Sequence, residues 1–325
     1  MGRVLSAYAD VLRRPGAAAF SAAALLARLP MSTLALGIVL LVSLERGSYL
    51  GAGAVAAGWT LPQALLSPWL GRLVDRRGQA RVMWPLLAVH VSGVVALVAV
   101  VLAGLPLVVA TGCAALAGLG FGAPGSLARA RWSHLLGDSP RLHTAFSLES
   151  VLDEVLFITG PVLVTLLAVE VHPAAGVLLA LAGTAVGYPL LLLQRGSEPP
   201  AGPGGGGRHA GSVWALPGVR VLVVTFGLLG AVFGSVDLST VALTAALGRP
   251  TAAGPVLAVF AVASLLAGVV FGAVSWRRPP GDLLVAGTAV FGAGAVLTTL
   301  AGSPVALAGA LLVTGAGISP VMISG

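Results

Sequence analysis

Long apolar stretches, each followed by a short polar break, recur along almost the entire chain. Each stretch is about 20 residues long, which is the length that an α-helix needs to cross the hydrocarbon core of a bilayer. The approximate ranges of these stretches are 17–44, 50–70, 82–104, 106–127, 146–168, 174–194, 218–245, 251–275, 283–301 and 304–325. The pattern therefore predicts an all-α membrane protein with about 10 transmembrane helices.

The composition supports a chain solvated by lipid. Hydrophobic residues make up 57% of the sequence and charged residues only 9%, and the mean hydropathy is +1.01. The first apolar stretch is too long for the apolar region of a cleaved signal peptide, and no clear small-residue cleavage site follows it. Cys113 is the single cysteine and falls inside the fourth stretch, so an intramolecular disulfide is excluded.

The net charge of +7 could indicate a nucleic-acid partner, but the distribution of the charges argues against one. If the N-terminus is cytoplasmic, fifteen of the eighteen basic residues, all of them arginine, fall on the cytoplasmic side. These are Arg3, Arg13, Arg14, Arg72, Arg76, Arg77, Arg81, Arg129, Arg131, Arg141, Arg195, Arg208, Arg220, Arg277 and Arg278. The charge therefore indicates topology, with some attraction to anionic lipid head groups, and we expect no nucleic-acid binding.

One segment, at about 195–217, lacks apolar character and is rich in glycine and proline. Its composition is typical of a flexible cytoplasmic linker. The glycine run lacks the strand, Lys and Ser/Thr context of a nucleotide-binding loop. The linker divides the chain into an N-terminal bundle of six helices at 1–194 and a partial C-terminal bundle of four helices at 218–325.

The two parts contain related patterns. Residues 272–278 repeat the Gly-x-x-x-x-Arg-Arg frame of residues 71–77, and the same displacement of 201 residues carries the first apolar stretch onto the seventh. The Gly-x-Gly and proline of residues 118–124 have an approximate counterpart at 315–320. Two homologous halves related by an axis along the membrane normal are typical of transporters that work by rocking of two bundles.

The polar break between the second and third stretches reads Gly71-Arg-Leu-Val-Asp75-Arg76-Arg77-Gly78-Gln-Ala-Arg81. This pattern resembles the signature loop of the major facilitator superfamily (MFS), which joins the second and third membrane helices on the cytoplasmic side. The resemblance implies a secondary transporter with two helical bundles.

The resemblance also implies a role for the loop, which in this family gates conformational exchange and does not contact the substrate. That role falls here on Gly71, Asp75, Arg76, Gly78 and Arg81. From the residue types alone, the glycines permit tight turns and close helix approach, and the aspartate can pair with the arginines or with helix termini. A solvated positive-inside loop is the alternative interpretation.

The family has six helices in each bundle, so this sequence lacks counterparts of the last two. We therefore expect either a fragment of a twelve-span transporter or a genuine ten-span protein.

Charged residues inside the apolar stretches are candidates for function, because each costs about 2.5–3.5 kcal/mol at the membrane centre on insertion scales. Arg28 lies in the first stretch, and Glu149, Asp153 and Glu154 open the fifth. In the resembled family these two helices are neighbours, so Arg28 could pair with Asp153 or Glu149. The cluster could bind substrate or a proton, or it could be a buried ion pair that fixes helix register.

Three further residues complete the candidate set. Asp237 in the seventh stretch could face a central cavity or could lie in water near the outer end of its helix. Gly160 and Pro161 resemble the helix-bending Gly-Pro of an antiporter motif, although the following glycine pair is absent. The fourth stretch also lacks the intramembrane arginine typical of drug/proton antiporters, which weakens an assignment to that subgroup.

These features predict a protein that is not an enzyme, because no Ser/His/Asp set has a nucleophile context and no His spacing suggests a metal site. No cofactor is expected. We expect a monomeric transporter, multi-pass in the plasma membrane of a bacterium, with its N-terminus in the cytoplasm. It would move a small molecule by alternating access, with protons as a candidate coupling ion. Export is favoured over uptake, because the candidate cavity residues are mostly small and apolar; the alternative is a transporter-like sensor or scaffold.

Overall fold

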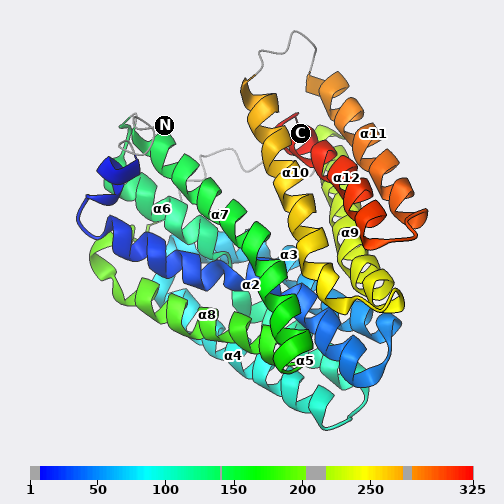
Figure 1. Cartoon of the computed structure of the whole chain (residues 1–325). Helices are drawn as coiled ribbons and strands as arrows, with labels where there is room; N and C mark the ends of the chain where they lie inside the picture. Colours follow the sequence, from blue (N-terminus) through cyan, green and yellow to red (C-terminus); the bar gives the residue numbers. More distant parts are fainter. Residues whose placement is uncertain (1–7, 140, 203–216, 274–279, 325) are drawn as a thin grey trace. The chain divides into compact units, whose positions relative to one another are not determined.

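The computed structural model describes residues 8–139, 141–202, 217–273 and 280–324, and no strand occurs among them (Figure 1). Each apolar stretch of the sequence falls on helix in this part of the chain, but the fourth, at 106–127, covers all of α5 and the start of α6. The α-helices are α2 (Ala17–Arg46), α3 (Tyr49–Arg77), α4 (Gln79–Leu102), α5 (Leu107–Phe121), α6 (Pro124–Leu136), α7 (Arg141–Leu166), α8 (Ala175–Leu193), α9 (Pro217–Ala246), α10 (Ala253–Ala273), α11 (Pro280–Thr299) and α12 (Pro304–Ser324). The glycine run of the linker and the arginine pair of the second repeat lie outside the described residues.

Seven helical segments of the described chain are long and apolar enough to cross a membrane. They are Ala17–Arg46, Gln79–Leu102, Leu107–Leu136, Arg141–Val171, Ala175–Leu193, Pro250–Gly268 and Gly281–Thr299. The described apolar parts of α9 and α12 are shorter, and α3 is less apolar because it carries polar residues along its length. The structure thus supports a multi-span, all-helical membrane protein.

The helices gather into two compact units. Unit 1 comprises Met1–Leu156 and Pro173–Gly205, and unit 2 comprises Phe157–His172 and Gly206–Gly325. Helix α7 therefore contributes its first part to unit 1 and its last part to unit 2.

In unit 1, α2 is a central helix that packs along α8 and also contacts α3 and α6 (Figure 1). Two glycines on α8, Gly183 and Gly187, bring the backbones together. A Cβ at Gly187 would lie 2.2 Å from the amide nitrogen of Ala27, and one at Gly183 would lie 2.9 Å from the carbonyl oxygen of Leu26. Small residues four apart permit this close approach in membranes, where packing rather than the hydrophobic effect drives helix association.

Three other glycines of unit 1 sit equally close to a neighbouring backbone. In each case a Cβ would approach a main-chain atom to 2.5 Å or less, so no larger residue fits without movement of a helix. The contacts are Gly93 on α4 with the Ala117 nitrogen, Gly118 on α5 with the Trp59 oxygen, and Gly120 on α5 with the His90 nitrogen. Together they fix α5 against α3 and α4.

Unit 2 contains the same three contacts between the equivalent helices, which are α10, α11 and α12 (Figure 1). A Cβ at the equivalent glycines would lie 2.4–2.5 Å from the same kind of main-chain atom as in unit 1. The contacts are Gly294 with the Thr314 nitrogen, Gly315 with the Phe260 oxygen, and Gly317 with the Phe291 nitrogen. The short sequence matches between the two parts therefore correspond to matching backbone packing.

We expect Gly187→Ala to destabilise unit 1 by about 1–3 kcal/mol, because the new methyl group forces α8 away from α2. Gly112→Ala in α5 is the matched control, since a Cβ there meets no atom within 4 Å. The control should change stability by no more than about 0.5 kcal/mol. The fraction of monodisperse protein that survives heating in detergent measures both effects. Equal survival of the two variants would contradict the close α2–α8 packing.

Candidate functional site

The site begins with a break in the chain between α5 and α6. Gly122 adopts φ +70°, a backbone conformation that favours glycine, and Pro124 then starts α6 at its first turn, where its missing N–H costs nothing. A Cβ at Gly122 would lie 2.5 Å from the Met83 side chain. The Tyr188 hydroxyl donates a hydrogen bond to the carbonyl of Phe121, one of the groups that the break deprives of a helical partner.

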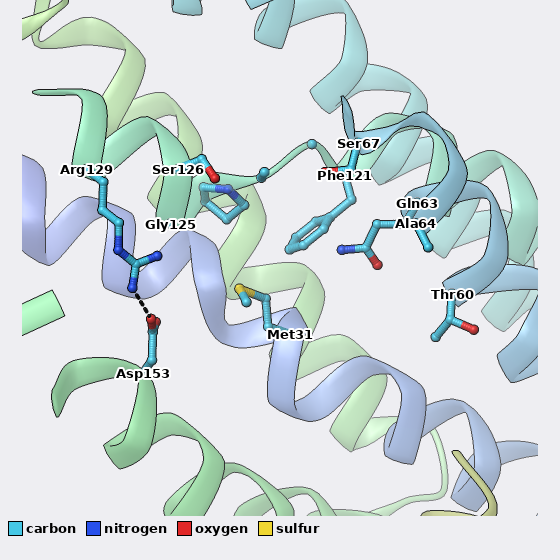
Figure 2. A pocket seen from close by; sticks show the side chains of 13 residues that line it. Met31, Thr60, Gln63, Ala64, Ser67, Phe121, Gly125, Ser126, Arg129 and Asp153 are labelled. Carbon is cyan, nitrogen blue, oxygen red and sulfur yellow. Dashed lines mark hydrogen bonds and ion pairs between the residues drawn. The ribbon is translucent and has the colours of Figure 1, made fainter. Parts of the chain in front are cut away.

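A cavity of about 320 Å³ lies beside this break, within unit 1. Figure 2 shows the Arg129–Asp153 ion pair at one end and Thr60 at the other, with Met31 and Gln63 between them. The lining residues are Met31, Thr60, Gln63, Ala64, Ser67, Phe121, Gly122, Ala123, Pro124, Gly125, Ser126, Arg129 and Asp153. The cavity thus has a charged end and a more neutral, partly apolar end.

Behind the charged end lies an ion pair between Arg28 on α2 and Glu149 on α7, and both side chains are fully buried. Glu149 Oε2 accepts from Arg28 Nη2, while Oε1 accepts from Ser21 Oγ at 2.7 Å and from Trp132 Nε1 at 2.7 Å. Both carboxylate oxygens are therefore hydrogen-bonded, which is the condition under which a buried charge is tolerated.

The pair extends outward through Asp153. Arg28 Nη1 donates to Asp153 Oδ1 at 2.7 Å, and Arg28 Nε donates to the Ala24 carbonyl at 3.1 Å. The other oxygen of Asp153 accepts from Arg129 Nη2 on α6 at 3.2 Å. Exposure increases along this chain of charges, from 0% at Arg28 to 21% at Asp153 and 38% at Arg129.

The Arg28–Glu149 and Arg28–Asp153 pairings are both options that the sequence left open, and the structure contains both. The cluster has two positive and two negative charges, so it is formally neutral. Only Asp153 and Arg129 line the cavity. The inner pair can therefore hold the helices together, while the outer pair meets whatever enters the cavity.

Two other acidic candidates lie apart from this cluster. Glu154 follows Asp153 on α7 and is partly buried, but it does not line the cavity. Asp237 lies on α9 in unit 2 and is also partly buried. It has no ion-pair partner among the described residues.

The predicted helix-bending residues lie in the part of α7 that belongs to unit 2. Gly160 and Pro161 are both buried, and Pro161 stands inside the helix, where it removes one backbone hydrogen bond. A Cβ at Gly254 on α10 would lie 2.6 Å from the Pro161 carbonyl oxygen. A π-helical turn at Leu167–Val171 follows.

The signature segment differs in structure from the loop that the sequence predicted. Helix α3 continues to Arg77 and α4 begins at Gln79, so Gly78 alone joins them, with φ +88°. Gly71 is helical, and a Cβ there would meet no atom within 4 Å, so it forms neither the expected turn nor a close contact in the described structure. The helix continues through residues 71–77 because this part of the chain contains no proline and because arginine and leucine favour helix.

The charged residues of the segment are exposed. Asp75, Arg76 and Arg81 all belong to this exposed group. The backbone carbonyl of Asp75 accepts a hydrogen bond from the Gly202 N–H at 3.2 Å. Its side chain forms no ion pair with the described arginines.

A second polar cluster fastens the chain that leaves α8 to the start of α4. Arg131 on α6 is fully buried, and its Nε donates to Gln79 Oε1 at 2.8 Å. Its Nη1 donates to the Gln194 carbonyl and to Ser197 Oγ, both at 2.7 Å. Glu198 accepts from the Ala80 N–H at 2.9 Å, so it caps the N-terminus of α4.

A smaller cavity of about 70 Å³ also lies within unit 1. It shares Ser67, Gly122, Ala123 and Ser126 with the larger cavity. It is also lined by Gly71, Val74, Asp75 and Gln79. The signature segment and the main cavity are therefore adjacent.

Sequence reasoning missed Arg129 and Arg131 as site residues, because both lie beyond the fourth apolar stretch. Pro124 is the signal that could have found them, since proline marks the first turn of a helix and a helix starting there carries both arginines. Arg129 then reaches the cavity and Arg131 the α4 terminus. Gln63 and Phe121 carried no signal of their own.

Comparison of the chain with protein-family models and with curated proteins finds no match. Among the described residues, no group of three or more His, Cys, Asp and Glu side chains could hold a metal ion.

We expect Glu149→Gln to lower stability by about 3–5 kcal/mol, the range for breaking a buried ion pair, because it leaves the Arg28 charge only half compensated. The control is Asp10→Asn, which removes a pair with Arg141 in which both side chains are about half exposed. Such a pair contributes about 0–1 kcal/mol. Thermal unfolding in the same detergent compares the two variants, and similar melting temperatures would contradict a structural role for the buried pair.

Proposed function

We propose that this protein is a secondary active transporter that moves a small molecule across the plasma membrane of a bacterium by alternating access. The observation that carries the proposal is the cavity beside the α5–α6 break, with its Arg129–Asp153 pair. Binding sites of secondary transporters are typically formed where a membrane helix is discontinuous and its backbone lines a cavity. Polar and charged groups are costly within a membrane, so their presence at such a site favours a functional role.

The proposal extends to the MFS type of architecture. The matching glycine contacts of the two units support two homologous bundles, since they involve the same backbone atoms of equivalent helices. We place the bundles at 1–194 and 218–325, with the linker at 195–217 and the N-terminus in the cytoplasm. The protein would act as a monomer, without enzymatic activity.

The gating role proposed for the signature segment rests on its position. The smaller cavity joins Gly71 and Asp75 to the residues that line the main cavity. The Arg131 cluster holds Gln79 at the start of α4 and also holds the chain that leaves α8. A change at the α3–α4 junction would therefore reach both the cavity and the start of the linker. Export of cargo, with Asp153, Glu154 or Asp237 as proton carriers, completes the proposal.

Alternating access can be tested before any cargo is known. In a Cys113→Ala background, which removes the single cysteine, Ser67→Cys places a thiol in the cavity lining. We expect a membrane-impermeant maleimide to label this thiol both in right-side-out and in inside-out vesicles, because the cavity opens to each side in turn. Asp75→Asn should change the ratio of the two labelling rates by severalfold.

The matched control is Val95→Cys in the same background, on an exposed apolar position of α4 away from the cavity. An impermeant reagent should not reach it from either side. Labelling of Ser67→Cys from one side only would refute alternating access and favour a transporter-like sensor or scaffold.

A further inference from the structure

We propose that the ligand of the unit 1 cavity is a small amphipathic carboxylate, with its anionic group on Arg129 and its apolar part against Met31 and Ala64. The proposal rests on the proposed function in one respect, which is that this ligand is the transported cargo.

Of the four clustered charges, Arg129 has the most hydrogen-bond capacity left for a ligand. Glu149 already accepts three hydrogen bonds from buried side chains, and Arg28 already serves both acidic residues. Asp153 has an arginine on each of its two oxygens. Arg129 carries five N–H donors on a partly exposed side chain, and its contact with Asp153, at 3.2 Å, is the longest of the three ion pairs in the cluster.

The same reasoning disfavours a cationic ligand. A cation on Asp153 would lie beside the positive charges of Arg28 and Arg129, which already bind its two oxygens. An anion needs only to exchange with Asp153 for the outer arginine, because Asp153 keeps its 2.7 Å bond to Arg28. A guanidinium can also bind a carboxylate through two parallel hydrogen bonds, which makes the exchange favourable.

Helix α6 adds to the positive potential at this end. Its N-terminus lies at the break, and Pro124, Gly125 and Ser126 all line the cavity. The N-terminus of a helix carries a partial positive charge, which attracts anions. Pro124 has no N–H and the Ser126 N–H donates to the Ala123 carbonyl at 3.0 Å, so Gly125 is the residue of the three that can offer its N–H to a ligand. Half-helix N-termini point at anionic substrate groups in other transporters with discontinuous helices.

The side chains at the opposite end of the cavity determine which kind of group the rest of the ligand carries. Met31 and Ala64 offer apolar surface, and Gln63 and Thr60 are uncharged polar groups beyond Met31 (Figure 2). Among the described residues, no acidic or basic side chain other than the Arg129–Asp153 pair lines the cavity. A volume of about 320 Å³ accommodates a molecule the size of benzoate.

Three probes of nearly the same shape separate the possibilities: benzoate, benzyl alcohol and benzylamine. With the full chain purified into lipid nanodiscs, radiolabelled benzoate should bind saturably, and the alcohol and the amine should compete poorly. Arg129→Gln should weaken benzoate binding by about tenfold or more, as expected for loss of a charge-assisted hydrogen bond. Arg129→Lys should restore part of the affinity, and Arg141→Gln, at an exposed position, should leave it unchanged.

Asp153→Asn provides a test that a purely structural role would not pass. Removing the carboxylate frees Arg129 from its competitor, so benzoate should bind severalfold more tightly in this variant than in the unmodified protein. A merely structural Asp153 would instead give weaker or unchanged binding. Arg129→Gln keeps the proposal testable if Asp153→Asn misfolds, because Arg129 is 38% exposed and lies outside the fully buried pair.

Several outcomes would overturn the carboxylate assignment: no saturable benzoate binding, equal competition by all three probes, or binding that survives Arg129→Gln. Flux in proteoliposomes separates this inference from the proposed function. Arg129-dependent benzoate binding without benzoate flux would support the ligand class and count against transport. Flux of a neutral or cationic cargo without benzoate binding would support transport and refute the ligand class.

Discussion

Unit 1 depends on one interaction, the fully buried ion pair between Arg28 and Glu149. Neither charge could remain there alone, because an unpaired ion in a low-dielectric interior is strongly disfavoured. The pair joins α2 to α7, and Trp132 extends it to α6. It also fixes the register of α7, so that Asp153, one helical turn further, stands at the edge of the cavity. The position of Asp153 at the cavity is thus a consequence of the buried Arg28–Glu149 pair.

Much of the helical plan could be predicted from the sequence, since the ability of a segment to cross a membrane depends mostly on the sum of its own side chains. The apolar stretch at 17–44 gave α2 almost without error, and the charge of Arg28 inside it required an acidic partner. The break between α5 and α6 could not be found this way. It depends on the positive φ of Gly122 and on the Tyr188 hydroxyl, which comes from another helix.

The same distinction explains the two arginines on α6 and the signature segment. Hydropathy ends the fourth stretch before Arg129, but the helix continues past it because Arg129 and the buried Arg131 both find partners in tertiary structure. The pattern of Gly71 and Gly78 suggested two turns, and only Gly78 provides one. A glycine permits a turn with positive φ, but packing against neighbouring helices determines whether the turn forms. The role of the segment in gating and the ligand of the cavity stay predictions that only function can test.

The connection between α3 and α4 through Gly78 alone has a mechanical consequence. With no loop between them, the end of α3 and the start of α4 stay close to each other, since Asp75 and Gln79 are separated by three residues. Because Gln79 is bonded to Arg131 and the neighbouring Ala80 to Glu198, a tilt of α3 is passed to the chain beyond α8 without slack. A change in the angle between α3 and α4 therefore depends on rotation of the backbone at Gly78.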